Sequence, residues 1–335
     1  MADYAFASDN TAGACPEAMA AILAANEGFT SGYGTDAVTA RAGDLIRDLL
    51  DADADVRFVA SGTAANAISC ASLCRPFEAI LAHEDAHICT DETGAPGFFG
   101  QGLGLIRLPG ASGRIDPAAL DAALAGPDAS YRQSPAALSL TNATEYGTVY
   151  SVEAVRALTS RARAAGLPVH FDGARLANAA ASGFDLKALK TLDISILVIG
   201  GTKAGASLSE AIVLFDRRLS HRFDARLKQA GQLPSKGRFL AAPWIGMLES
   251  GAWLDRARHA NAMARRLAGL TPFPVRHPVE ANGVFVDMDE AALERLRSKG
   301  YFVYRFLDGT VRFMCSWATT EASVEALGET LRAIA

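Results

Sequence analysis

Asp172 and Lys203 are the two residues of this chain whose types and positions most directly suggest chemistry. Each follows an apolar run that predicts a strand, over 167–171 and 194–199. Open α/β sheets hold ligands at the carboxyl ends of their strands. A carboxylate can keep the ring nitrogen of pyridoxal phosphate protonated, and an amine can form a Schiff base with its aldehyde. The pair therefore predicts a pyridoxal phosphate enzyme.

The residues around Lys203 favour a confined site over a solvated lysine. A single aspartate at a strand end most often caps a turn, and a single lysine is most often solvated. Here Lys203 follows Gly200, Gly201 and Thr202, and it precedes the uncharged run 204–206. Such a turn of small residues lets backbone amides approach a phosphate. We therefore expect Thr202 and Lys203 in the cofactor site.

A second anion site is predicted where Ser61, Gly62 and Thr63 open an expected helix over 64–74. The free backbone amides and hydroxyl groups of such a turn can hold a phosphate. Taken alone, the Ser-Gly-Thr turn is weak evidence for a phosphate site, because many such turns only cap a helix. With Lys203 in the same chain, a phosphate site is the preferred interpretation.

The order of the elements predicts the fold class. Helical and strand-like segments alternate from about residue 36 to residue 216, which predicts an α/β fold with a mostly parallel sheet covered by helices. We expect a large domain over 1–243 and a small C-terminal α+β domain over 244–335. The expected strands are 57–60, 79–82, 104–108, 136–141, 167–171, 194–199, 211–215, 283–287, 302–306 and 310–314, and the expected helices are 36–50, 64–74, 244–270 and one from Thr320.

The composition limits the classes of partner. The 335 residues include 32 basic and 37 acidic ones, for a net charge of −5, and 50% are hydrophobic, so a large core is expected and nucleic acid is not an expected partner. No secretory leader and no apolar run of membrane-spanning length is evident, which predicts a cytoplasmic protein. The five cysteines are scattered, which indicates reduced thiols, and with no CxxC motif in the chain a zinc site is not expected.

Further motifs resemble those of the low-specificity L-threonine aldolases, in the same order along nearly the whole chain. They are FASDNT (6–11) with Pro16, GYGTD (32–36), SGTAAN (61–66), His87 with Glu92 and Gly94, DGAR (172–175) and Lys203. The segments ATEYGTVYS (143–151) and VRFMCSW (311–317) resemble the bacterial threonine and phenylserine aldolases.

This resemblance implies a fold-type I pyridoxal phosphate enzyme that cleaves L-threonine, L-allo-threonine or phenylserine to glycine and an aldehyde. It also implies a homodimer or homotetramer with active sites at the dimer interface, where Tyr33 and Lys228 reach the neighbouring subunit's cofactor. By resemblance, Lys203 forms the Schiff base, Asp172 pairs with the ring nitrogen and His87 stacks on the ring. The implied cofactor-binding residues are Ser61, Gly62, Thr63, His87, Asp172, Arg175, Thr202, Lys203 and Lys228, and the substrate-binding residues are Ser8, Tyr33, Thr144, Arg175 and Arg312.

The general base is left open by the sequence. Many threonine aldolases have a second active-site histidine in an Asn-Thr-His segment, where this chain has Thr144. A threonine can hydrogen-bond the substrate hydroxyl, but its pKa excludes it as a base on its own, which leaves His87, His83 or a bound water. His170 is expected to be structural, and His221, His259 and His277 are expected at the surface.

Two other functions remain open at this point. A β-eliminating lyase on the same fold would use the same Lys203 and Asp172. A non-catalytic pyridoxal phosphate-binding regulator would need a DNA-binding segment, and no basic helix-turn-helix is evident. Arg312 also has two interpretations, since an arginine on a strand is commonly a solvated edge residue, but its apolar neighbours favour an enclosed carboxylate-binding role.

Overall fold

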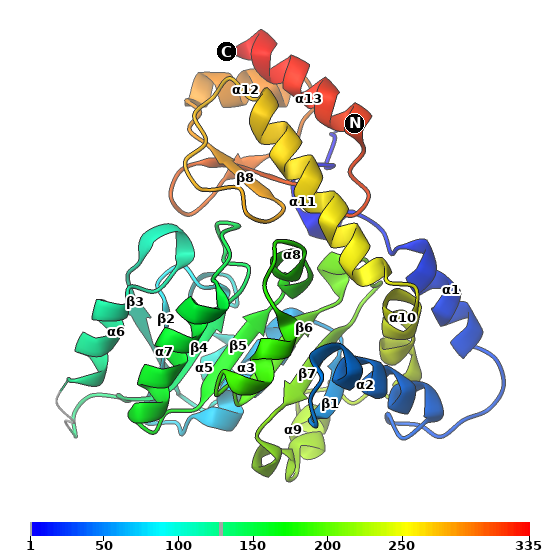
Figure 1. Ribbon diagram of the computed structural model, residues 1–335, viewed down its shortest axis with the longest axis vertical. Coiled ribbons are helices and arrows are strands. Elements are labelled where there is room, and N and C mark those ends of the chain that lie inside the picture. Colours follow the sequence, from blue (N-terminus) through cyan, green and yellow to red (C-terminus); the bar gives the residue numbers. More distant parts are fainter. Residues whose placement is uncertain (1, 127–129) are drawn as a thin grey trace.

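The computed structural model describes residues 2–126 and 130–335, and it contains two β-sheets with helices packed on them (Figure 1). The larger sheet has seven strands in the order β1-β7-β6-β5-β4-β2-β3. Its strands are β1 (Asp55–Val59), β2 (Glu78–His83), β3 (Gly104–Leu108), β4 (Ser134–Thr141), β5 (Val169–Gly173), β6 (Ile196–Gly200) and β7 (Glu210–Leu214).

The large sheet is mostly parallel, as predicted. Strand β7 runs antiparallel to both of its neighbours, β1 and β6, so the other six strands share one direction. Every expected strand of this sheet is present, with ends shifted by no more than two residues. Because β1, β2, β4, β5 and β6 point the same way, the loops after them all leave from one edge of the sheet.

Helices cover both faces of the large sheet, because its strands are apolar on both sides. Along β6, Leu197 and Ile199 belong to one core cluster, and Ile196 and Val198 belong to another. The first face packs on α1 (Pro16–Ala25), α2 (Ala37–Leu50), α6 (Pro117–Leu124), α7 (Val152–Ala164), α8 (Leu176–Ala181) and α10 (Arg238–Glu249). The second face packs on α3 (Gly62–Leu73), α4 (His87–Thr90) and α9 (Phe223–Gln229), with α5 (Ala95–Phe99) beside α3.

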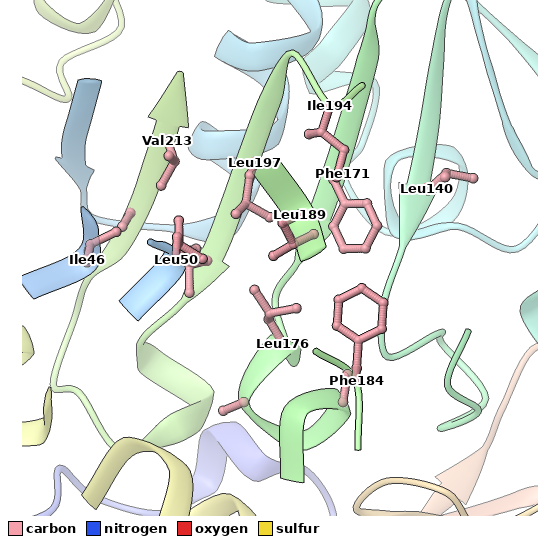
Figure 2. Packing of buried hydrophobic residues seen from close by; sticks show 14 of the residues in the cluster. Ile46, Leu50, Leu140, Phe171, Leu176, Phe184, Leu189, Ile194, Leu197 and Val213 are labelled. Carbon is pink, nitrogen blue, oxygen red and sulfur yellow. The ribbon is translucent and has the colours of Figure 1, made fainter. Parts of the chain in front are cut away.

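Figure 2 shows the packing on the first face. Phe171 of β5 stacks on Phe184, with ring centroids 6.2 Å apart. Ile46 and Leu50 of α2 lie close to Val213 and Leu197 of the sheet. The same alternation that buries Phe171 on this face turns Asp172 toward α3 on the other face.

The smaller sheet has three antiparallel strands in the order β8-β10-β9, namely β8 (Gly283–Val286), β9 (Tyr304–Arg305) and β10 (Val311–Met314). It packs with α12 (Glu290–Ser298) and α13 (Glu321–Ile334). Phe6 from the N-terminal segment is buried in this core. The division at residue 243 stays a prediction.

Helix α11 (Ala252–Leu270) links the two cores: Trp253 packs in the large one and Leu267 in the small one (Figure 1). The expected single helix over 244–270 is wrong. Helix α10 begins before Pro243 and continues through it, and Gly251, with φ of 79°, separates α10 from α11. A left-handed residue cannot continue a right-handed helix, which explains the break.

Short 3-10 helices complete the described secondary structure: η1 (Asp9–Thr11), η2 (Ala111–Gly113), η3 (Leu186–Thr191), η4 (Thr202–Ala204) and η5 (Arg217–Ser220).

The expected surface position of His277 is wrong. Its side chain is 11% exposed, packs against Tyr146 with ring centroids 4.4 Å apart, and hydrogen-bonds Asp308 at 2.8 Å. Sequence neighbours gave no sign of these partners, because they lie far away in the chain.

No helix in residues 2–126 and 130–335 is both long and apolar enough to cross a membrane. The five cysteines are all free. Within the same residues, no group of three or more His, Cys, Asp or Glu side chains is placed to hold a metal ion.

Candidate active site

The carboxyl edge of the large sheet gathers the residues that the sequence singled out. Asp172 lies at the end of β5, and Lys203 follows β6 in η4. His87 follows β2, and α3 begins directly after β1. The shared strand direction explains why residues from such separate parts of the chain meet at one edge.

A hydrogen-bonded network behind this edge orients Asp172 and His87. Asn66 Nδ2 donates to Asp172 Oδ2 at 2.8 Å and to Glu92 Oε1 at 2.9 Å. His87 Nδ1 lies 2.9 Å from the same Glu92 oxygen. The second oxygen of Asp172 accepts from the amide of Ala174 at 2.9 Å. Asp172 is 2% exposed, so this carboxylate is held in one orientation inside the protein.

The network also affects protonation. The hydrogen bond to Glu92 raises the pKa of His87 above its ordinary value, although burial works against it. Burial raises the pKa of Glu92. The His87 side chain is 30% exposed and lies at the cavity described below, so it presents one ring edge to Glu92 and keeps the rest of the ring available to a ligand.

Glu210 and Ser209 of the following segment hydrogen-bond the turn that carries Lys203. Glu210 Oε2 accepts from the amide of Gly201 at 2.8 Å, and the hydroxyl of Thr202 accepts from the amide of Ser209 at 3.2 Å. Glu210 is buried, which raises its pKa to about 7. These bonds position Lys203 without using its own side chain.

Arg175 is already paired with a carboxylate. Its Nε and a terminal nitrogen donate to Asp9 at 2.7 and 3.0 Å, and Asn282 Nδ2 donates to the same carboxylate at 3.0 Å. Burial opposes ionisation of Asp9, but the charge and hydrogen bonds of Arg175 prevail and lower the pKa of Asp9 to about 2. Arg175 therefore has less freedom to bind a ligand than the sequence suggested.

Arg312 has no such partner. It lies on β10, is 8% exposed, and forms no ion pair with any carboxylate in the described part of the chain; its Nε also lacks a hydrogen-bond acceptor there. Its guanidinium stacks on the rings of Tyr304, at 4.9 Å, and Phe306, at 4.8 Å. Burial, and then the charge of Arg175, lower the pKa of Arg312. A buried cation in this state is ready to receive an anion.

A cavity of about 360 Å³ lies among the side chains of Lys203, His87, Arg175 and Arg312, whereas Asp172 does not line it. Of the residues expected from the sequence, Ser8, His87, Arg175, Lys203 and Arg312 line it. Four further contributions were not anticipated, namely Asn10, Asp91, Glu145 and the segment 304–307. Acidic side chains facing a cavity carry no local signal in the sequence that separates them from solvated ones.

Other expected site residues lie elsewhere in the single chain. Lys228 Nζ lies 4.7 Å from the ring centroid of Tyr33, which lines a separate cavity of about 260 Å³. Thr144 is buried and does not line the Lys203 cavity; its hydroxyl bonds Thr148 Oγ1 at 2.8 Å. His83 is also buried, and both of its ring nitrogens have backbone partners at 3.1 Å.

The start of α3 has the form expected for an anion site. The Ser61 hydroxyl accepts from the amide of Ala64 at 3.2 Å, as an N-cap residue does. Gly62 and Thr63 are the first helical residues, so their amides have no carbonyl one turn earlier to bind. A Cβ at Gly62 would meet nothing within 4 Å, so space is open beside this helix end.

Together these features fit pyridoxal phosphate. The cofactor's aldehyde requires an amine, which Lys203 provides, and its ring nitrogen requires a fixed carboxylate, which Asp172 provides. Its ring can pack against the partly exposed imidazole of His87, and its phosphate can bind the free amides of α3. Arg312, which lines the Lys203 cavity and has no carboxylate partner among the described residues, fits the carboxylate of an amino acid. Asn66 and Asp9, which orient these groups, were not assigned a role from the sequence.

Comparisons with known proteins agree with this chemistry. The family model of the beta-eliminating lyases matches residues 5–291. The low-specificity L-threonine aldolase of Pseudomonas sp. (strain NCIMB 10558) is 46% identical over 337 residues, which covers 98% of this chain and 97% of that protein.

Solved structures give the same picture. The threonine aldolase of Leishmania major superposes with a TM-score of 0.93 at 29% identity, covering 99% of this chain and 100% of that one. The serine palmitoyltransferase of Sphingomonas wittichii shares the fold, with a TM-score of 0.72 at 15% identity, covering 98% of this chain and 86% of that one.

Proposed function

The chain belongs to the beta-eliminating lyase family and, within it, to the low-specificity L-threonine aldolases, and from this we propose that it cleaves L-threonine and related β-hydroxy-α-amino acids at the Lys203 cavity. The products are glycine and an aldehyde. Its cofactor is pyridoxal phosphate. The observation that carries the assignment to this cavity is Arg312, which has no carboxylate partner among the described residues, lines the same cavity as Lys203 and can hold an amino acid's carboxylate there.

The cofactor is held by four groups in this proposal. Lys203 would hold it through its amine, Asp172 would accept a hydrogen bond from its ring nitrogen, and His87 would pack against its ring. The helix start at 61–63, with Thr202 beside Lys203, holds the phosphate. When bound, the cofactor supplies an electron-poor ring that takes up the electron pair released at the substrate's Cα.

Arg312 and Ser8 bind the substrate carboxylate, and the Asp9 pair with Arg175 stabilises the wall of the cavity. A guanidinium can grip a carboxylate through two parallel hydrogen bonds, which fixes the rotation of the substrate about Cα. That rotation would decide which bond at Cα is aligned for cleavage. The amine of Lys203 lines the same cavity and, when protonated, would be placed to give a proton to Cα of the substrate.

The substrate class includes L-threonine, L-allo-threonine and phenylserine. The cavity of about 360 Å³ has room for side chains of different size at the β-carbon. Phe306 and Leu307 line the cavity, and apolar residues can accept a methyl or a phenyl group.

The assembly is a homodimer or homotetramer in which Tyr33 and Lys228 complete the active site of a second copy. Tyr33 is 50% exposed and Phe29 is fully exposed in the loop before α2, so this segment has apolar surface available for a partner. The protein acts in the cytoplasm, where thiols stay reduced, which suits five free cysteines.

The function is tested by incubating the protein and a Lys203→Ala variant with pyridoxal phosphate and each of L-threonine, L-allo-threonine and phenylserine. We expect glycine and the matching aldehyde from the unaltered protein, and background amounts from the variant, because no other lysine lines the cavity among the described residues. Borohydride reduction followed by peptide mapping should place the cofactor on Lys203.

Two results would contradict the proposal. A 2-oxo acid and ammonia in place of glycine and aldehyde would indicate a β-eliminating lyase. A reduced cofactor on another residue, or cleavage that survives Lys203→Ala, would show that the catalytic centre lies elsewhere.

A further inference from the structure

Glu145 is a carboxylate in the Lys203 cavity that the roles above do not use. It is half-buried, and no donor within the described residues hydrogen-bonds it or pairs with it. Its charge acts on His87, Arg175 and Arg312, three of the basic side chains that line the cavity. An unpartnered carboxylate in this position is free to accept a proton from a ligand.

The backbone holds Glu145 between two anchored neighbours. The hydroxyl of Thr144 bonds Thr148 Oγ1 at 2.8 Å, and the hydroxyl of Tyr146 donates to Asp85 Oδ2 at 2.8 Å. Both neighbours are buried. The turn therefore fixes the position of residue 145 and leaves its side chain as the one member of this triplet that reaches the cavity.

The other candidate bases are engaged or poorly placed. His83 does not line the cavity, and both of its ring nitrogens have partners. His87 uses Nδ1 to bond Glu92. Asp91 lines the cavity but is exposed, and its Oδ2 accepts a hydrogen bond from a neighbouring threonine.

We propose that Glu145 is the general base that takes the β-hydroxyl proton of the substrate, an inference that rests on the proposed aldolase function. The O–H bond breaks, its proton passes to a carboxylate oxygen of Glu145, and its electron pair becomes the second C–O bond of the aldehyde. The Cα–Cβ bond breaks, and its electron pair stays with the glycine half. That half takes up one proton at Cα and Glu145 releases one, so no proton is gained or lost overall.

The charges in the cavity suit this division of tasks. Arg312 is positive and takes the substrate carboxylate, while Glu145 is negative and faces the hydroxyl end. Repulsion between the two carboxylates and attraction to the guanidinium both favour this one orientation of the substrate.

The experiment compares two reactions of Glu145→Gln. Cleavage of L-threonine requires removal of a hydroxyl proton, so we expect kcat to fall by about a hundredfold or more, the range for a lost general base. Exchange of the Cα hydrogen of glycine with deuterated water involves no hydroxyl group, so we expect its rate to stay within about threefold, and we expect the glycine Kd from spectral titration to stay unchanged. Glu329→Gln, the same change at an exposed site on α13, should alter neither reaction.

A second variant guards against a folding defect. Glu145→Ala opens space for a small carboxylate, so added formate or acetate should restore threonine cleavage in proportion to its concentration. A residue with only a structural role would show no such rescue.

Each other outcome is decisive. If Glu145→Gln cleaves threonine at nearly the original rate, or if Glu145→Ala folds and is not rescued, the base is another group and the inference is wrong. If cleavage and glycine exchange fall together, Glu145 acts on the cofactor site rather than on the hydroxyl. If the unaltered protein exchanges glycine but cleaves no β-hydroxy-α-amino acid, the proposed function itself fails.

Discussion

Arg312 is a guanidinium buried without a carboxylate partner, which is a costly arrangement in the free protein. Aromatic stacking on Tyr304 and Phe306 offsets part of the cost, but Nε remains without an acceptor in the described residues. Arg175 shows the contrast, because the same side-chain type in the same cavity is neutralised by Asp9. An unmet bonding capacity of this kind is available to a ligand.

Arg312→Ala should therefore raise KM for L-threonine far more than it lowers kcat. Losing one partner of a buried charge pair costs about 2 to 5 kcal/mol, which corresponds to a rise in KM of about thirtyfold or more. Arg312→Lys keeps the positive charge but loses the planar guanidinium that binds both carboxylate oxygens, so its KM should lie between those of the unaltered protein and Arg312→Ala. Steady-state kinetics measure both, and the absorbance of the bound cofactor should not change.

An unchanged KM in Arg312→Ala, with normal cofactor absorbance, would remove this residue from the substrate site.

At the scale of elements, the site depends on how closely strand ends approach one another. Gly200 ends β6 beside β5, and a Cβ there would overlap the backbone oxygen of Ala174. A Cβ on Gly201 would overlap the backbone oxygen of Ser209 and the ring of Trp244. Glycine at these positions lets β5 and β6 bring Asp172 and Lys203 to one edge.

Gly200→Ala should lower the free energy of unfolding by about 1 to 3 kcal/mol, because backbone atoms of a packed sheet cannot move aside cheaply. Urea unfolding followed by circular dichroism measures the change. Gly269→Ala is the matched control: this residue is exposed in α11, and its added Cβ would meet nothing within 4 Å.

The control should be neutral or stabilising by up to about 1 kcal/mol, since alanine favours a helix more than glycine does. Equal destabilisation by both substitutions would show that the close approach at β6 is unimportant.

At the scale of the whole molecule, Asp9 joins three parts of the chain. It lies in η1 of the N-terminal segment, pairs with Arg175 after β5, and accepts from Asn282 beside β8 of the small sheet. Phe6, nearby in the sequence, is buried in the small core. The N-terminal segment is therefore part of the contact between the two sheets (Figure 1).

The stability of this contact should depend on pH. The pKa of Asp9 is about 2 in the folded protein against an ordinary 3.8, so the unfolded chain binds its proton first as pH falls. The pair then contributes about 2 kcal/mol that is fully present above about pH 4 and is lost as pH falls toward about 2.

Urea unfolding of the unaltered protein and of Asp9→Asn at pH 7, 4 and 3 tests this. At pH 7 the variant should be less stable by about 3 to 5 kcal/mol, because Arg175 is left buried and unpaired. The difference should shrink as pH falls, because only the unaltered protein has this group to protonate. A constant difference at the three pH values would contradict the assignment.

Much of the fold and part of the site follow from local patterns. The apolar runs predicted each strand of the large sheet, because burial on both faces requires continuous apolar residues. Asp36 and Ser61 cap α2 and α3, as their side-chain types indicate, since a cap bonds amides only a few residues away. Lys203 and Asp172 were found because each stands at a strand end that the sequence alone reveals.

Only the tertiary structure decided which distant groups meet. It paired Arg175 with Asp9, left Arg312 without a counter-ion, and turned Glu145 rather than Thr144 into the cavity. It also set β7 antiparallel, which no apolar run encodes. The physical reason is range: caps and strands depend on neighbours in the chain, whereas charge partners and cavity walls depend on how strands order themselves and how the small sheet packs on the large one.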